Sequence, residues 1–125
     1  MADMEQLQFA SILIDKRINE EDKGIITIRM SSELDHGTLK NLRSLFQREW
    51  DAENYKLVLN LKRLKFIYSA HIGVIWAFVQ KMQKAKGGVH FCEVPESILS
   101  AFNTLGLTKV MKIYDKEDEA FNAFS

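Results

Sequence analysis

Apolar residues recur along this chain at two alternating periods, which predicts a mixture of strands and helices. The β-branched run Ile25–Met30 and the apolar run Leu57–Leu61 are short and bounded by polar residues, as buried strands are. Between them, apolar residues recur at steps of three and four and predict an amphipathic helix: Leu39, Leu42, Leu45, Phe46 and Trp50. The partly alternating segment 9–18 predicts one further strand, at the edge of the sheet and in a hairpin with Ile25–Met30.

The second half of the chain repeats the alternation. A helix is predicted from about Ala70 to Lys86, with Gly87 and Gly88 ending it. Its core-facing stripe is Ile72, Ile75, Trp76, Val79 and Met82. Val74 and Phe78 lie off this stripe, so they are either covered by a neighbouring element or part of an exposed contact patch.

The remaining elements are shorter. Residues 89–94 and 110–114 predict two strands, and between them Pro95 suits the first position of a short helix. Asp115 and Asp118 resemble a capping pair for a terminal helix. The predicted fold is therefore α/β, a mixed four- to five-stranded sheet with about four helices. We expect a single domain over residues 1–125, with its core at about 9–124.

Composition narrows the classes of function. Seventeen basic and seventeen acidic residues cancel, which argues against direct nucleic-acid binding. The longest apolar segment, Ile72–Val79, is too short to span a bilayer, and Met1–Gln6 has no secretory pattern, so we expect a cytoplasmic protein without membrane insertion. Cys92 is the only cysteine and is expected to be a small core residue.

Ser69 stands where the loop after the Leu57–Leu61 strand turns into a helix. Serine is a favoured N-cap, and its hydroxyl would then lie beside unpaired N–H groups at the positive end of the helix dipole. A negative charge is stabilised at such a place. Two loops at carboxyl ends of strands, residues 31–37 and 65–71, are the expected sites of function.

Three motifs in this order resemble the STAS domain family (sulfate transporter and anti-sigma factor antagonist), and most closely its free-standing bacterial anti-sigma factor antagonists. The first is the loop Glu33–Thr38 before the first helix. The second is the strand Leu57–Leu61 running into Phe66–Gly73, which is similar to the family's phosphorylation loop. The third is Leu105–Leu107 with the segment 113–120 that follows.

The resemblance implies a regulatory binding protein rather than an enzyme, without a cofactor. Its implied partner is an anti-sigma factor that is also a serine kinase, and Ser69 is the implied phosphoacceptor. The implied partner-binding residues are Glu33, Asp35, His36, Tyr68, Ala70, His71 and Ile72. Whether the protein forms a homodimer is left open.

Three positions depart from the family's pattern: Tyr68 replaces an aspartate, Ala70 a serine and His71 a glycine. Tyr68 and His71 form either a new docking surface or a packed aromatic beside a solvated imidazole. The alternative function is a phosphorylation-independent STAS adaptor subunit of a transporter or signalling complex. The sequence has no phosphate-binding loop and no G-x-S-x-G motif, and its three histidines lack the spacing of metal ligands.

Overall fold

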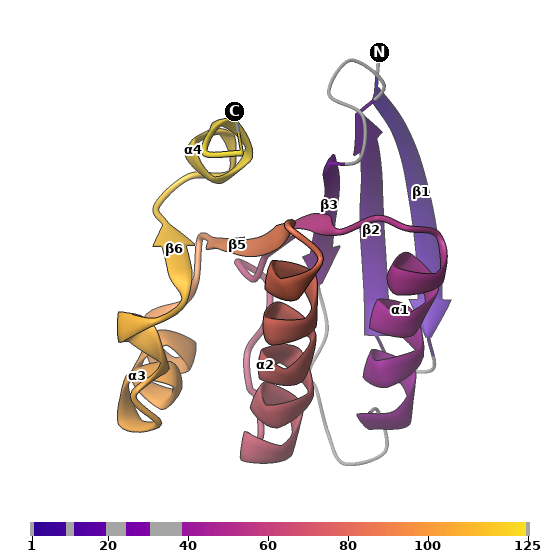
Figure 1. Cartoon of the computed structure of the whole chain (residues 1–125). Helices are drawn as coiled ribbons and strands as arrows, with labels where there is room; N and C mark the ends of the chain where they lie inside the picture. The colour runs from indigo at the N-terminus through magenta and orange to yellow at the C-terminus, as the bar shows by residue number, and fades with distance from the viewer. Residues whose placement is uncertain (1, 10–11, 20–24, 31–38, 125) are drawn as a thin grey trace.

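A single six-stranded sheet organises the protein (Figure 1). The computed structural model describes the backbone of residues 2–9, 12–19, 25–30 and 39–124, and the side chains of 25–30 and 39–124. The strands lie in sequence order: β1 (Ala2–Phe9), β2 (Ile12–Asn19), β3 (Ile25–Met30), β4 (Lys56–Asn60), β5 (Gly88–Cys92) and β6 (Lys112–Tyr114). The β1–β2 and β2–β3 pairs are antiparallel, whereas β3 to β6 run parallel. The predicted mixed α/β class is confirmed.

Helices connect the parallel strands. These are α1 (Leu39–Asp51), α2 (Ser69–Lys84) and α3 (Glu96–Thr104), with a 3-10 turn η2 (Leu107–Lys109) before β6 and α4 (Glu117–Asn122) after it. Since a crossover between parallel strands is right-handed and the strands follow sequence order, α1, α2 and α3 return over one face. Within the described ranges, no helix combines the length and hydropathy needed to cross a bilayer.

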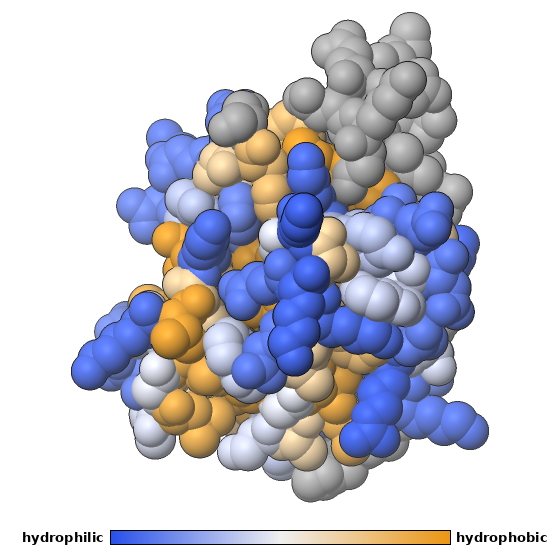
Figure 2. Space-filling view, viewed as in Figure 1, coloured by the Kyte–Doolittle hydropathy of each residue, from blue (hydrophilic) through white to orange (hydrophobic). Residues whose placement is uncertain are grey.

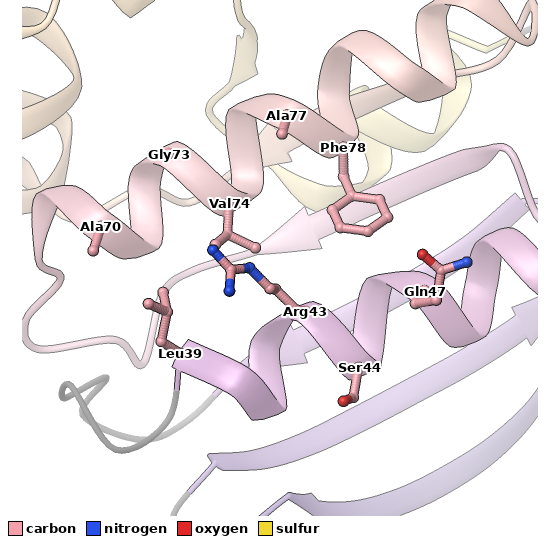
Figure 3. A pocket seen from close by; sticks show the side chains of 9 residues that line it. All are labelled: Leu39, Arg43, Ser44, Gln47, Ala70, Gly73, Val74, Ala77 and Phe78. Atoms are coloured by element: carbon pink, nitrogen blue, oxygen red, sulfur yellow. The ribbon is translucent and has the colours of Figure 1, made fainter.

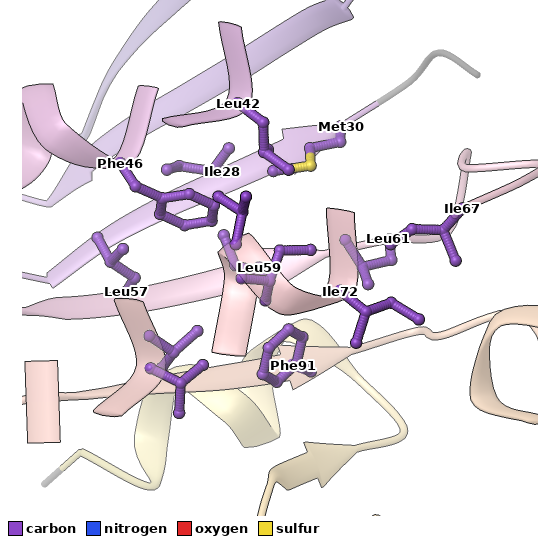
Figure 4. Packing of buried hydrophobic residues seen from close by; sticks show 14 of the residues in the cluster. Ile28, Met30, Leu42, Phe46, Leu57, Leu59, Leu61, Ile67, Ile72 and Phe91 are labelled. Atoms are coloured by element: carbon purple, nitrogen blue, oxygen red, sulfur yellow. The ribbon is translucent and has the colours of Figure 1, made fainter. Parts of the chain in front are cut away.

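Alternate residues of β3, β4 and β5 belong to two separate hydrophobic cores. The larger core joins Ile28, Leu59 and Phe91 to the inner faces of α1, α2 and α3 (Figure 4). The residues between them point to the opposite face, where Val58 and Cys92 pack with Ala120 of α4. Cys92 is therefore the small buried residue that was predicted, and burial raises the pKa of its thiol to about 12.

The N-terminal part differs from the prediction. Two strands, β1 and β2, take the place of the single strand predicted at 9–18, so the sheet has six strands rather than four or five. The pairing of β2 with β3 confirms the predicted antiparallel partner. The edge position predicted for that strand is wrong, because β1 pairs along its whole length.

Helix boundaries also differ in detail. Pro95 and Lys116 are the N-cap residues of α3 and α4, so the first helical position predicted for Pro95 and the cap predicted for Asp115 are both wrong. At the end of α2, Lys86 adopts the left-handed conformation with φ 65°. Gly87 serves close packing instead, since a Cβ there would lie 1.8 Å from the Tyr55 carbonyl oxygen.

Candidate functional site

The segment 61–68 carries the chain from β4 to the start of α2 and is fixed to the core by every third side chain. Leu61, Leu64 and Ile67 are buried. The residues between them are exposed: Lys62, Arg63, Lys65 and Phe66. Because its buried residues hold it in place, this loop presents a defined surface next to α2.

Ser69 is exposed and is the first residue of α2. Tyr68, with φ −91° and ψ 157°, is the N-cap, and its side chain forms no capping hydrogen bond. The Tyr68 carbonyl oxygen accepts from the N–H groups of His71 and Ile72 at 3.0 and 3.1 Å. The N-cap role predicted for Ser69 is therefore wrong by one position. Its hydroxyl still lies in the first turn, where N–H groups have no partner within the helix and the dipole favours negative charge.

The residues around Ser69 divide between the surface and the core. Ala70 is exposed and Tyr68 is half-buried. His71 is 0% exposed and Ile72 is 2% exposed, so neither side chain is on the surface that a partner would meet. The prediction of a solvated imidazole or a docking contact at His71 is thus wrong: His71 shares the inward helix face with Ile75 at i+4.

Two aromatic residues, Phe66 and Tyr68, come just before the serine in the chain. The Phe66 side chain is 49% exposed and meets the Tyr68 ring edge-on, with centroids 4.6 Å apart. The Tyr68 ring is in turn 5.8 Å from the buried His71 ring. An exposed aromatic held against a second ring is a typical anchor of a protein interface. Phe66 is thus a candidate contact residue that the sequence analysis did not select.

Glu33, Asp35 and His36, the predicted binding residues of the other loop, lie outside the described residues. Their predicted roles remain predictions.

A groove of about 560 Å³ runs between α1 and α2 beside this loop (Figure 3). This α1–α2 groove is lined by Leu39, Arg43, Ser44, Gln47, Ala70, Gly73, Val74, Ala77 and Phe78. Val74 is 6% exposed, and the half-buried Phe78 ring stacks on Phe46 with centroids 5.2 Å apart. Neighbouring α1 thus covers much of both side chains, and what remains accessible lines the groove. Ala70 belongs to the groove and also adjoins Ser69.

A second, polar cavity of about 300 Å³ lies at the carboxyl ends of β3, β4 and β5. The buried Asn60 amide donates to Glu93 at 2.5 Å and to Glu117 at 3.1 Å, while its oxygen accepts from the Lys62 N–H at 3.0 Å. The Arg29 guanidinium binds the Glu117 carboxylate at 2.8 and 2.6 Å. These groups satisfy one another and join three strands to α4, so the arrangement is structural.

The face of the molecule seen in Figure 2 is mixed in hydropathy. Hydrophilic residues cover most of the face seen in Figure 2, with hydrophobic patches over the region of α3 at lower left. The exposed Leu105 and Val110 belong to the segment after α3. No group of three or more potential metal ligands occurs among the described residues.

Comparison with known proteins identifies the family. The sequence pattern of the STAS domain matches residues 16–120. An anti-sigma F factor antagonist from Paenibacillus polymyxa is 31% identical over 102 residues, which cover 81% of this chain and 87% of that protein.

Two solved structures share the fold. The crystal structure of a candidate anti-sigma factor antagonist from Thermotoga maritima has a TM-score of 0.80 at 19% identity and covers 87% of this chain and 92% of its own. The Bacillus cell fate determinant SpoIIAA in its phosphorylated form has a TM-score of 0.65 at 17% identity, with all of both chains covered. The order of elements, the presentation of Ser69 and the match over residues 16–120 lead to one conclusion: this chain belongs to the STAS domain family.

Proposed function

We propose that this protein is an anti-sigma factor antagonist, which binds an anti-sigma factor through the surface around Ser69. The observation that carries the proposal is the exposed hydroxyl of Ser69 in the first turn of α2, in a STAS chain. The relative from Paenibacillus polymyxa, named an anti-sigma F factor antagonist, supports the same role.

The binding surface consists of Ser69, Ala70 and the Phe66–Tyr68 ring pair. Phe66 supplies apolar area and Tyr68 supplies a polar edge, a combination that suits a protein interface. The buried side chains of His71 and Ile72 act indirectly, because they hold the first turn of α2 against the core.

Phosphorylation of Ser69 by the partner would switch this binding. A phosphate adds about −1.5 to −2 charges at neutral pH and three strong acceptor oxygens. The unpaired N–H groups and the dipole of α2 stabilise that charge by roughly 0.3–1 kcal/mol, so the free protein tolerates the modification. An interface formed against the neutral hydroxyl would have to bury the added charge, and the complex would dissociate.

A second candidate is a STAS adaptor that binds without phosphorylation. The ring pair beside Ser69 favours it, because Tyr68 stands where the family carries an aspartate and half-buried tyrosine gives a constitutive apolar contact. Both candidate functions use the same binding surface. They differ in whether phosphorylation of Ser69 controls the binding.

One experiment separates them. The full-length protein is used to purify its partner from source cells, and the purified pair is then incubated with ATP and analysed by intact mass. A mass gain of one phosphate, lost in Ser69→Ala and kept in the exposed control Ser97→Ala, is the expected result. A partner that binds without any mass gain would support the adaptor, and failure of an anti-sigma factor to bind at all would overturn the proposal.

A further inference from the structure

We propose that the α1–α2 groove receives an acidic amphipathic helix of the same partner, in addition to the contact at Ser69. The inference rests on the proposed function and adds the kind of partner segment that the surface fits. It makes the binding site two adjoining surfaces, of which only the first contains the phosphoacceptor.

The groove has the shape that a helix needs. α1 and α2 each follow a parallel strand and lie side by side along the groove (Figure 3). The α2 wall is lined by Ala70, Gly73 and Ala77, which are exposed and spaced at i, i+3 and i+7. They span about 10 Å of helix, or two turns. Because a Cβ added at Gly73 would meet nothing within 4 Å, another backbone can approach closely there.

The floor of the groove is apolar. Leu39, Val74 and Phe78 provide it, and Figure 3 shows the Phe78 ring directed from α2 toward α1. An occupant therefore inserts apolar side chains at helical spacing, as in other helix-in-groove interfaces.

The charges around the groove select an acidic occupant. The Arg43 guanidinium reaches from α1 into the space between the helices, and none of the described carboxylates pairs with it. Lys81 lies outside the lining, with its ammonium 4.3 Å from the Trp50 ring centroid and 5.4 Å from the Phe78 ring centroid. α2 contains no acidic residue. Among the described residues that line the groove, Arg43 is the only charged one, so the charge that this lining presents is cationic.

The groove and the Ser69 surface are continuous. Ala70 lines the groove and is the neighbour of Ser69, so a single partner covers both without a gap. Binding in the groove adds affinity that does not depend on the hydroxyl, and phosphorylation of Ser69 then acts on only part of the interface.

Site-specific photo-cross-linking in source cells tests this inference. A photoreactive phenylalanine analogue is placed in the full-length protein at Ala77 in the groove, at Ala70 beside Ser69, or at the exposed Asn122 of α4 as a control. The cross-linked peptides are sequenced. We expect Ala77 to label an acidic segment with apolar residues at helical spacing, in the same protein that Ala70 labels.

The other outcomes are distinct. Labelling from Ala70 alone would leave the proposed function standing and overturn the groove as a binding site. Labelling of a second copy of this chain from Ala77, or a small molecule co-purifying in the groove, would also overturn it. Absence of labelling from both positions would overturn the proposed function as well.

Substitutions at two positions in the groove sharpen the result. Gly73→Leu fills the open space next to Val74 and should reduce affinity for the identified partner at least tenfold, with its thermal midpoint unchanged or raised. Arg43→Glu should reduce it to a similar extent, and Arg43→Lys should restore most of the affinity. Equal affinities for Arg43→Glu and Arg43→Lys would contradict an acidic occupant.

Discussion

Arg29 of β3 and Glu117 of α4, 88 residues apart, form a two-pronged ion pair with Nε–Oε1 and Nη2–Oε2 distances of 2.8 and 2.6 Å. Asn60 donates to the same carboxylate at 3.1 Å. Together they hold the first residue of α4 at the carboxyl edge of the sheet. α4 also covers the smaller core, in which Ala120 packs with Val58 and Cys92, and so shields the Cys92 thiol from solvent.

Glu117→Ala should therefore loosen α4. Because both side chains are partly solvent-exposed, we expect a loss of only roughly 1 kcal/mol in the free energy of unfolding. Alkylation of Cys92 under native conditions should accelerate severalfold, since local opening of α4 exposes it. Glu119→Ala, at an exposed position of the same helix, is the control. If the two variants react at equal rates, the ion pair does not hold α4 in place.

His90 should make stability depend on pH. Burial lowers the pKa of its imidazole below 6.5, opposed by the hydrogen bond in which Nδ1 donates to the Ala120 carbonyl oxygen at 2.8 Å and aided by Lys112. The folded state thus binds the proton more weakly than the unfolded chain does. The contribution is fully present above about pH 6.5 and is lost as pH falls toward the folded pKa, by at most about 1.4 kcal/mol per pH unit.

His90→Asn tests this dependence. The variant keeps an N–H donor for Ala120 but cannot titrate, and it loses the ring stacked on Phe124 at 3.7 Å. Urea unfolding between pH 5 and 8 should show a less stable protein whose slope below pH 6.5 is shallower than that of the wild type. If the free energies of unfolding of the variant and the wild type fell equally with pH, groups other than His90 would be responsible for the acid sensitivity.

Two glycines should respond oppositely to the same substitution. Gly73→Ala lies in an open part of α2 and should raise stability by about 1 kcal/mol through helix propensity. Gly87→Ala would place a Cβ 1.8 Å from the Tyr55 carbonyl oxygen and should cost roughly 3 kcal/mol. Thermal unfolding of both variants measures the two changes in stability. If Gly87→Ala were as stable as the wild type, the backbone at Gly87 would be able to move away from Tyr55.

Two aromatic residues should differ in their contribution to the core. Phe46 is 0% exposed and stacks on Phe78, so Phe46→Ala should cost ~3–5 kcal/mol. Trp76, predicted as core, is only partly buried, and Trp76→Ala should cost clearly less. Denaturant unfolding gives both values; a larger loss at Trp76 would contradict its partial exposure.

Charge at position 69 should weaken partner binding. Ser69→Glu should lower affinity for the partner at least tenfold, equivalent to about 1.4 kcal/mol, whereas Ser69→Ala should bind like the wild type. Titration calorimetry with the purified partner measures both. Equal affinities of the two variants would exclude an electrostatic switch.

The fold was predictable where a local pattern carries it. Ile25–Met30 is rich in β-branched residues and Leu57–Leu61 is apolar apart from Asn60, because both runs are buried on both faces. β1 was missed because half of Ala2–Phe9 is polar and its apolar–polar alternation is interrupted at Glu5 and Gln6. Its pairing with β2 supplies the hydrogen bonds that sequence composition does not reveal.

The site was predictable in position but not in detail. The helical period and the loop motif placed Ser69 at the start of α2, yet the phase of the first turn makes Tyr68 the cap and buries His71. Histidine is classed as a polar residue, so a hydropathy pattern does not predict that His71 is buried. Its inward position follows only from its helical spacing of four and eight residues from Ile75 and Val79. The Arg29–Glu117 pair joins distant segments and leaves no periodic pattern at all.

The capping of α2 by Tyr68 has a consequence for Ser69. No described residue forms a hydrogen bond with the Ser69 hydroxyl, so within the described part of the chain no side-chain contact depends on this oxygen. A reversible modification of this hydroxyl would therefore leave the fold of the described residues unchanged. Its effect would be confined to the protein that binds at this surface.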